Sequence, residues 1–316
     1  MANAVVGDDV WGDDPTVAQL EVMAAELTAK EAALFVPSGT QSNLCALLTH
    51  CRRGDEYLIG KDAHAYKYEG GGGAALGGIA SQPLPVEPDG TIALDVIDKA
   101  VRPNDFHFAR TRLLCLENTF YGRVVPLAWQ RDALAVARRH QLATHLDGAR
   151  LFNAAVKLGV TPATVADGFD SVSICLSKGL GAPVGSLLCG AHDFIRQARR
   201  WRKMLGGGMR QSGILAAAGI YALQHNIARL ADDHANAALL AVGLQDIPQV
   251  AVDPALVQTN MVFMTPAAGT AEALAKHLQQ QGILVDPGAT IRIVTHLDVS
   301  RADVTAVIEA IRAFYR

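Results

Sequence analysis

The sequence has 316 residues, of which 50% are hydrophobic, with a formal net charge of −3 and a pI near 6.4. A chain of this length can form one large core, or a large domain with a smaller one. The charge balance indicates no nucleic-acid or membrane partner, and no apolar run predicts a transmembrane helix. The five scattered cysteines are expected to be buried thiols in a reducing cytoplasm, without a zinc site.

The first predicted elements alternate between helix and strand. Asp14 is expected as the N-cap of a helix over 14–33, with Pro15 in its first turn. A strand at 34–36, a turn at 38–40 and an apolar helix over 41–51 follow, and His50 is expected as a cation at that helix's C-terminal end. The next predicted strand is at 57–59.

The same alternation continues through the middle of the chain. Strands are predicted at 112–116, 142–146, 171–176 and 187–189, with helices over 129–140 and 191–204. Such alternation predicts an α/β fold with a mainly parallel sheet covered by helices. We therefore predict a large domain over 1–235.

After about residue 235 the pattern changes. It predicts strands at 259–264, 283–285 and 290–295, and helices over 271–281 and 301–314. We expect a small α+β domain over 236–316, joined to the large domain through a long helical stretch at 213–245. In the strand at 290–295, Arg292 alternates with two isoleucines and should point away from their face. An arginine there suits two-point carboxylate binding, although an edge-strand surface charge is a common alternative.

Parallel sheets bind ligands at the carboxyl ends of their strands. Gly39 and Thr40 follow the first predicted strand, where free N–H groups and a hydroxyl can bind a phosphate. Asp147 follows the strand at 142–146, and Lys178 stands 31 residues further on, after the next strand. A lysine that forms a Schiff base, a carboxylate for a pyridine nitrogen and a phosphate cradle are what pyridoxal 5′-phosphate (PLP) requires. Each residue alone is more often structural, so the prediction depends on the combination.

Several stretches resemble the threonine aldolases, a family of PLP-dependent enzymes. They are Gly7–Thr16, Pro37–Asn43, His145–Arg150, Cys175–Ser186 and Gly206–Gln211, and the resemblance continues to Thr295–Asp298. It implies the fold type I of PLP-dependent transferases, with a seven-stranded, mainly parallel sheet and a small C-terminal domain. It also implies cleavage of L-threonine, L-allo-threonine and related β-hydroxy-α-amino acids to glycine and an aldehyde.

The resemblance assigns roles to individual residues. Lys178 resembles the lysine that binds PLP, Asp147 the partner of its pyridine nitrogen, and Arg150 a residue near its phenolic oxygen. The other assignments are the phosphate binders Gly39 and Thr40, a ring-stacking and catalytic His64, a second catalytic His107, a phosphate-binding Arg210 from a neighbouring subunit, and the substrate-binding Arg292 and Trp11. No metal site is predicted. A homo-oligomer, as a dimer of dimers with active sites at the dimer interface, is implied.

Two alternatives stay open at this point. One is another fold type I PLP enzyme, either a β-eliminating lyase or an aminotransferase. The other is a PLP-fold protein that binds without catalysis. A loose dinucleotide pattern at 70–75 lacks the flanking strand and the ribose-binding acid of an NAD site, so we predict a flexible, close-packed loop near the active site there.

Overall fold

The computed structural model describes every residue from Met1 to Arg316. A seven-stranded sheet, in the order β1-β7-β6-β5-β4-β2-β3, forms the centre of the larger part. Only β7 runs antiparallel to its neighbours, so the predicted α/β fold with a mainly parallel seven-stranded sheet is confirmed. The strands are β1 (Ala32–Val36), β2 (Asp55–Gly60), β3 (Ala80–Leu84), β4 (Arg110–Glu117), β5 (Ala143–Gly148), β6 (Ser171–Cys175) and β7 (Ser186–Gly190).

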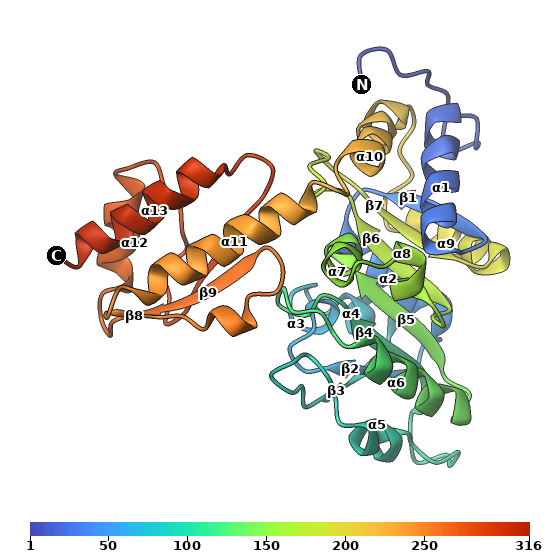
Figure 1. Ribbon diagram of the computed structural model, residues 1–316. Helices are drawn as coiled ribbons and strands as arrows, with labels where there is room; N and C mark the ends of the chain where they lie inside the picture. The colour runs from blue at the N-terminus through green and yellow to red at the C-terminus, as the bar shows by residue number, and fades with distance from the viewer.

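Helices cover both faces of this sheet (Figure 1). They are α1 (Pro15–Thr28), α2 (Gly39–His50), α3 (His64–Lys67), α4 (Gly72–Gly77), α5 (Leu94–Ala100), α6 (Leu127–Arg139), α7 (Leu151–Leu158), α8 (Pro162–Ala166), α9 (His192–Met204) and α10 (Gly213–His225). The alternation of strand residues separates the two faces. In β1, Phe35 belongs to the core under α1, whereas Leu34 and Val36 pack against α2 and α9.

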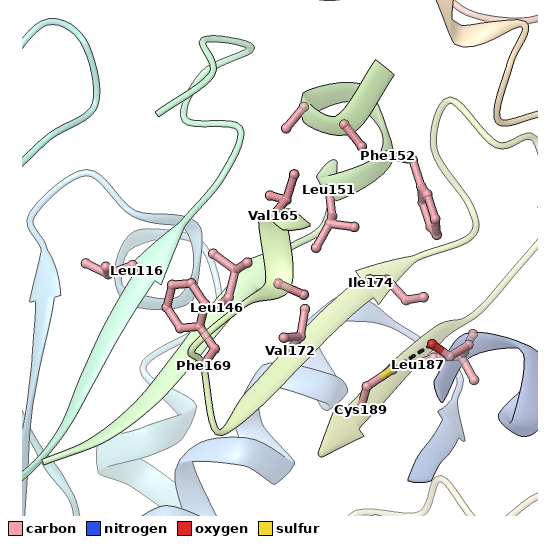
Figure 2. Close-up of a cluster of buried hydrophobic side chains, with 14 of the residues drawn as sticks. Leu116, Leu146, Leu151, Phe152, Val165, Phe169, Val172, Ile174, Leu187 and Cys189 are labelled. Atoms are coloured by element: carbon pink, nitrogen blue, oxygen red, sulfur yellow. Dashed lines mark hydrogen bonds between the residues drawn. The ribbon is translucent and has the colours of Figure 1, made fainter. Parts of the chain in front are cut away.

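The apolar core lies mainly on the α7 and α8 side of the sheet. Figure 2 shows Leu146 of β5 and Val172 and Ile174 of β6 pointing into this core, beside Val165 of α8 and Phe152 of α7. The residues that alternate with these three along β5 and β6 point to the opposite face of the sheet, under α2. Three of these, His145, Ser171 and Ser173, are polar and almost completely buried. Beneath α2, the sheet therefore has a buried, hydrogen-bonded polar region, with apolar clusters elsewhere on the same face.

Asp14 connects three separate segments of the chain. Its Oδ1 accepts hydrogen bonds from the backbone N–H groups of Thr16 and Val17, which confirms it as the N-cap of α1. Its Oδ2 accepts from the N–H groups of Gly7, at 3.2 Å, and Gly213, at 2.9 Å. The carboxylate thus holds the N-terminal segment and the start of α10 against the first turn of α1.

We expect Asp14→Ala to lower the free energy of unfolding by about 2 kcal/mol, because a helix cap is lost and further buried N–H groups lose their acceptor. Urea unfolding of the purified protein measures this difference. Asp13→Ala is the matched control, since Asp13 is exposed and is its immediate neighbour. Equal stability of the two variants would contradict the structural role of Asp14.

The C-terminal part forms its own three-stranded sheet with helices on it (Figure 1). Its elements are α11 (Leu230–Gln245), β8 (Val250–Ala251), the short 3-10 helix η1 (Pro254–Leu256), β9 (Met261–Pro266), α12 (Ala271–Gln279), β10 (Ile291–Val294) and α13 (Arg301–Phe314). A second apolar cluster begins at Ala237 and includes residues of α11, α12 and α13. No helix of the protein combines the length and the apolar character that spanning a bilayer requires.

Four predicted elements differ from the structure. The helix predicted over 14–33 ends at Thr28, and Ala32 and Ala33 belong to β1 instead. The helical stretch at 213–245 is two helices, because the chain breaks over 226–229. No strand forms at 283–285; Leu284 is 80% exposed there, and Pro287 just beyond lacks the N–H that a strand ladder needs. The glycine run at 70–75 is not a loop throughout, since α4 begins at Gly72.

Candidate active site

The carboxyl ends of β1, β2, β4, β5 and β6 lie at one edge of the sheet, because these five strands run in the same direction. Glu117 of β4 pairs in register with Asp147 of β5, which places two carboxyl groups side by side. Lys178 follows β6 at the same edge, and its positive charge acts on Glu117 and His64. The strand-end residues predicted from the sequence therefore converge in the structure.

Asn43 connects the strand-end carboxylate to a histidine. Its side-chain Nδ2 donates to Asp147 Oδ2 at 2.8 Å and to Glu69 Oε1 at 2.9 Å. Glu69 Oε1 also accepts from His64 Nδ1, at 2.8 Å. The hydrogen bond to Glu69 is the main cause that raises the pKa of His64, while burial raises the pKa of Glu69. Because Nδ1 is engaged, Nε2 is the ring nitrogen of His64 that remains available.

Glu117 is a buried carboxyl group at the centre of the site. Its Oε2 accepts the backbone N–H of His64 at 2.8 Å. Burial, and then the charge of Asp147, raise the pKa of Glu117 to about 8. At neutral pH this side chain is therefore a neutral carboxylic acid next to a carboxylate.

The raised pKa predicts a pH-dependent stability. Folded Glu117 holds a proton that the unfolded chain, with the ordinary pKa of 4.5, has released. Its stabilising contribution is complete below pH 4.5 and is lost as the pH rises through 8. We expect the free energy of unfolding of ligand-free protein to fall between these values, and Glu117→Gln to reduce that fall by about 1 kcal/mol or more. Urea unfolding at several pH values measures it, with Glu272→Gln at an exposed position as the control. An unchanged slope in Glu117→Gln would contradict the prediction.

Three features of the site fit the phosphate and ring of PLP. The first turn of α2 presents the backbone N–H groups of Gly39 and Thr40, which have no partner within the chain. Arg150, which follows β5, is half-buried, and its buried Nε has no hydrogen-bond partner. The side chain of Lys178 is half-buried and forms no ion pair within the chain. Free N–H groups, an unpaired guanidinium and an unpaired amine suit an anionic carbonyl compound.

Arg292 approaches this edge from the smaller sheet. Its neighbour Ile291 is completely buried, whereas Arg292 is exposed, so the predicted alternation is confirmed. Arg292 forms no ion pair within the chain. The cavity of about 1020 Å³ that it lines is formed by residues 272–296 of the C-terminal part and includes none of the strand-end residues of the large sheet. Burial, and then the positive charge of Arg292, lower the pKa of Arg150.

Within one chain, His107 lies apart from this group. It belongs to the loop before β4, whereas the site is at the other end of that strand, roughly 25 Å away at 3.3 Å per residue. Its Nδ1 hydrogen-bonds to Asp105 at 2.7 Å, and the side chain is 67% exposed. The assignment of His107 to the site is therefore wrong for a site built from a single chain.

Trp11 and Arg210 also lie outside the group within one chain. Trp11 is 75% exposed in a turn of the N-terminal segment. Arg210 forms an ion pair with Asp8 of the same segment. Neither side chain hydrogen-bonds to a strand-end residue of the site within the chain.

The sequence reasoning did not identify Asn43, Glu69 and Glu117. Glu117 ends a predicted strand, so the rule that found Asp147 would have found it as well. Asn43 lies one helical turn after Gly39, and Glu69 lies just before the glycine run; neither position carries a recognisable signal. His64, Glu69 and Asp147 also present ligand atoms within 4.8 Å of one another, but the amide of Asn43 donates into both carboxylates. This hydrogen bonding competes with coordination of a cation.

Comparison with known proteins gives consistent results. A family model described as beta-eliminating lyase matches residues 1–267. The chain is 51% identical over 314 residues to the low-specificity L-threonine aldolase of Escherichia coli (strain K12), covering 99% of this chain and 93% of that protein. It is 47% identical over 327 residues to the probable low-specificity L-threonine aldolase 2 of Arabidopsis thaliana, covering 100% and 92%. The solved structure of Leishmania major threonine aldolase is similar in fold, with a TM-score of 0.83 at 22% identity, covering 99% and 93%.

Proposed function

The chain belongs to the beta-eliminating lyase family, together with the low-specificity L-threonine aldolases, and from this we propose that it is a PLP-dependent carbon–carbon lyase. Its substrates are L-threonine, L-allo-threonine and related β-hydroxy-α-amino acids, which it cleaves to glycine and an aldehyde. The observation that carries this proposal is the meeting of Lys178, Asp147 and the first turn of α2 at one sheet edge, in a chain half identical to such enzymes. The fold is the fold type I of PLP-dependent enzymes.

We assign the cofactor-binding residues from their positions. Lys178 would bind PLP covalently, and Asp147 would pair with its pyridine nitrogen. Gly39 and Thr40 would bind its phosphate at the start of α2, and Arg150 would lie near its phenolic oxygen. When bound, PLP supplies an electron sink for the electron pair released at Cα.

The remaining residues act on the substrate. The planar guanidinium of Arg292 binds the carboxylate at two points and fixes how the Cα–Cβ bond is oriented. His64 stacks on the ring and takes the proton of the β-hydroxyl group at Nε2, because its Nδ1–H donates to Glu69. An imidazole is suited to this step at neutral pH.

The function is tested with purified protein, added PLP and L-threonine. We expect glycine and acetaldehyde in equal amounts. An aminotransferase would instead accumulate the amine form of the cofactor, and a β-eliminating lyase would release ammonia and an oxo acid. PLP bound without any of these products would favour the non-catalytic alternative.

We further infer that the site is completed by a second subunit of a homo-oligomer, arranged as a dimer of dimers. Arg210 and Trp11 are exposed on the single chain, and His107 lies too far from its own site to serve it. Arg210→Ala should weaken PLP binding. A mixture of Lys178→Ala and Arg210→Ala proteins should regain part of the activity in hybrid sites, measured as glycine formed after subunit exchange. No recovery despite demonstrated exchange would mean that each site is built from one chain.

Two further proposals concern organisation and location. We propose a large domain over 1–235 and a small domain over 236–316, with the boundary inside α11. Leu230 packs in the core of the large sheet, whereas Ala237 and the later residues of α11 belong to the second cluster. We also propose a cytoplasmic location, which the five free and buried cysteines support.

A further inference from the structure

The hydrogen bonds beneath the site converge on Asn43, which lies on α2 and is 2% exposed. We propose that Asn43 is a positioning residue whose amide fixes the Asp147 carboxylate and, through Glu69, the His64 ring in one joint arrangement. The inference rests on the proposed function only for the roles of Asp147 in PLP binding and of His64 as the base. The hydrogen bonds themselves are independent of that function.

The orientation of the Asn43 amide is determined by its partners. Nδ2 has two N–H groups and faces two carboxylates, Asp147 and Glu69, at 2.8 and 2.9 Å. Oδ1 faces His145 Nε2 at 3.1 Å. A reversed amide would place its oxygen against two carboxylate oxygens, so only one orientation is stable. One N–H group of Asn43 therefore binds Asp147, a residue of the proposed cofactor site. The other binds Glu69, which holds the candidate base His64.

The other side of Asn43 is held by uncharged groups. Burial lowers the pKa of His145 and of His50 to about 3, so both rings are neutral at pH 7. If His145 Nε2 donates to Asn43, its Nδ1 must accept from Ser171 Oγ, at 2.8 Å. Ser171 Oγ then accepts from His50 Nε2, at 2.7 Å. The expectation that His50 is a helix-terminal cation is wrong, because burial makes it a neutral donor at the start of this chain of hydrogen bonds.

Through its hydrogen bond to Glu69, Asn43 also determines the position of the His64 ring. The side chain of Glu69 is 4% exposed, whereas that of His64 is 44% exposed, so Glu69 is the fixed member of the pair. The groups that face His64 are Glu69, Asp147, Lys178, the carboxyl of Glu117 at its backbone N–H, and the ring of Tyr68. Among them only Glu69 bonds to the ring. Displacing Glu69 therefore releases the ring.

An asparagine is the residue type that this position requires. Aspartate would place a third carboxylate between two others. Leucine has nearly the same volume but no donor, so it would leave two buried carboxylates facing each other without the hydrogen bonds that separate them. Asn43→Leu should therefore disturb both arms of the arrangement, whereas Glu69→Gln should disturb only the His64 arm.

The test uses two measurements on the full chain. PLP affinity of ligand-free protein is measured by fluorescence titration, and the titration of His64 by NMR of the same ligand-free protein. We expect Asn43→Leu to weaken PLP binding about 10- to 100-fold, as for lost hydrogen bonds to charged groups. We expect it also to lower the pKa of His64, because Glu69 is no longer held against the imidazole and the hydrogen bond that raises this pKa is weakened. Glu69→Gln should lower the pKa of His64 and change PLP affinity less than Asn43→Leu does.

The matched control is Gln130→Leu. Gln130 is also a buried amide, 3% exposed, and its Nε2 donates to the Val165 carbonyl, away from the site. It should change neither measurement.

A wild-type value for Asn43→Leu in either measurement overturns the inference, even if stability falls, because a purely structural residue would behave in that way. If Asn43→Leu does not fold, Asn43→Ser, which keeps one donor, is judged by the same two values. Failure of the wild-type protein to bind PLP would instead refute the proposed function, and the His64 titration would then decide the inference alone.

Discussion

Lys178→Ala should abolish covalent binding of PLP and lower threonine cleavage by at least about 10⁴-fold, as for loss of a residue that forms a covalent bond in catalysis. The structure shows how the loop that carries Lys178 is held at the sheet edge. Lys178 follows β6 in a loop that the junction between α10 and α11 holds in place, where Asn226 Nδ2 donates to the Leu180 carbonyl at 2.7 Å and Arg229 to the Gly179 carbonyl at 3.3 Å. This fixes the amine near Glu117 and His64.

Two measurements check the prediction. Wild-type protein with PLP should show a visible absorbance band, and borohydride should trap a covalent adduct that peptide mass spectrometry locates at Lys178. Lys178→Ala should lack both, although PLP can still bind through its phosphate. Lys157→Ala is the control, because Lys157 is an exposed lysine of α7 and should keep the band and the activity. An adduct on another lysine would refute the assignment.

The parts of the fold that local pattern determines were predicted correctly. The apolar strands β1, β4, β5 and β6 and the capped helices α1 and α13 have clear periodicity or end signals. Strand β3 was not predicted, because its sequence is Ala-Ser-Gln-Pro-Leu. It is an edge strand, and it is held in the extended conformation by pairing with β2. The break between α10 and α11 has no glycine or proline. It depends on contacts with the loop of Lys178, which lies far away in sequence.

In the candidate site too, some residues could be predicted from local pattern, and others depend on contacts between distant parts of the chain. Asp147 and Lys178 could be predicted because the direction of parallel strands determines where their ends meet. Asn43 and Glu69 could not, since their roles exist only once α2 lies across β5 and the Glu69 turn closes on α2. The same limit explains His107: a resemblance of sequence assigns a residue to a site but does not say which copy of the chain supplies it.

The second large effect is expected at Arg292, which we infer controls which bond breaks as well as substrate affinity. Arg292 lies on β10, and Thr295, the residue after this strand, is anchored through its Oγ1 to the Asp233 carbonyl of α11 at 2.6 Å and through its N–H to the Asn260 carbonyl at 3.0 Å. A rigid strand holds the guanidinium, so a carboxylate bound at two points cannot turn. Arg292→Lys keeps the charge but loses the planar fork.

With a single-point contact the substrate can rotate about its Cα–N bond, and bonds other than Cα–Cβ then take the reactive orientation. Threonine cleavage by Arg292→Lys should fall by the equivalent of about 2–4 kcal/mol in kcat/KM, as for a lost transition-state contact. The D-amino acid and the amine form of the cofactor should rise as a share of total turnover. Glycine and both minor products are measured from one incubation, with Arg301→Lys, an exposed arginine at the start of α13, as the control. If Arg292→Lys raises only KM and leaves kcat and the product ratio unchanged, Arg292 binds the carboxylate without selecting the bond, because a contact used equally in the ground state and the transition state changes affinity alone.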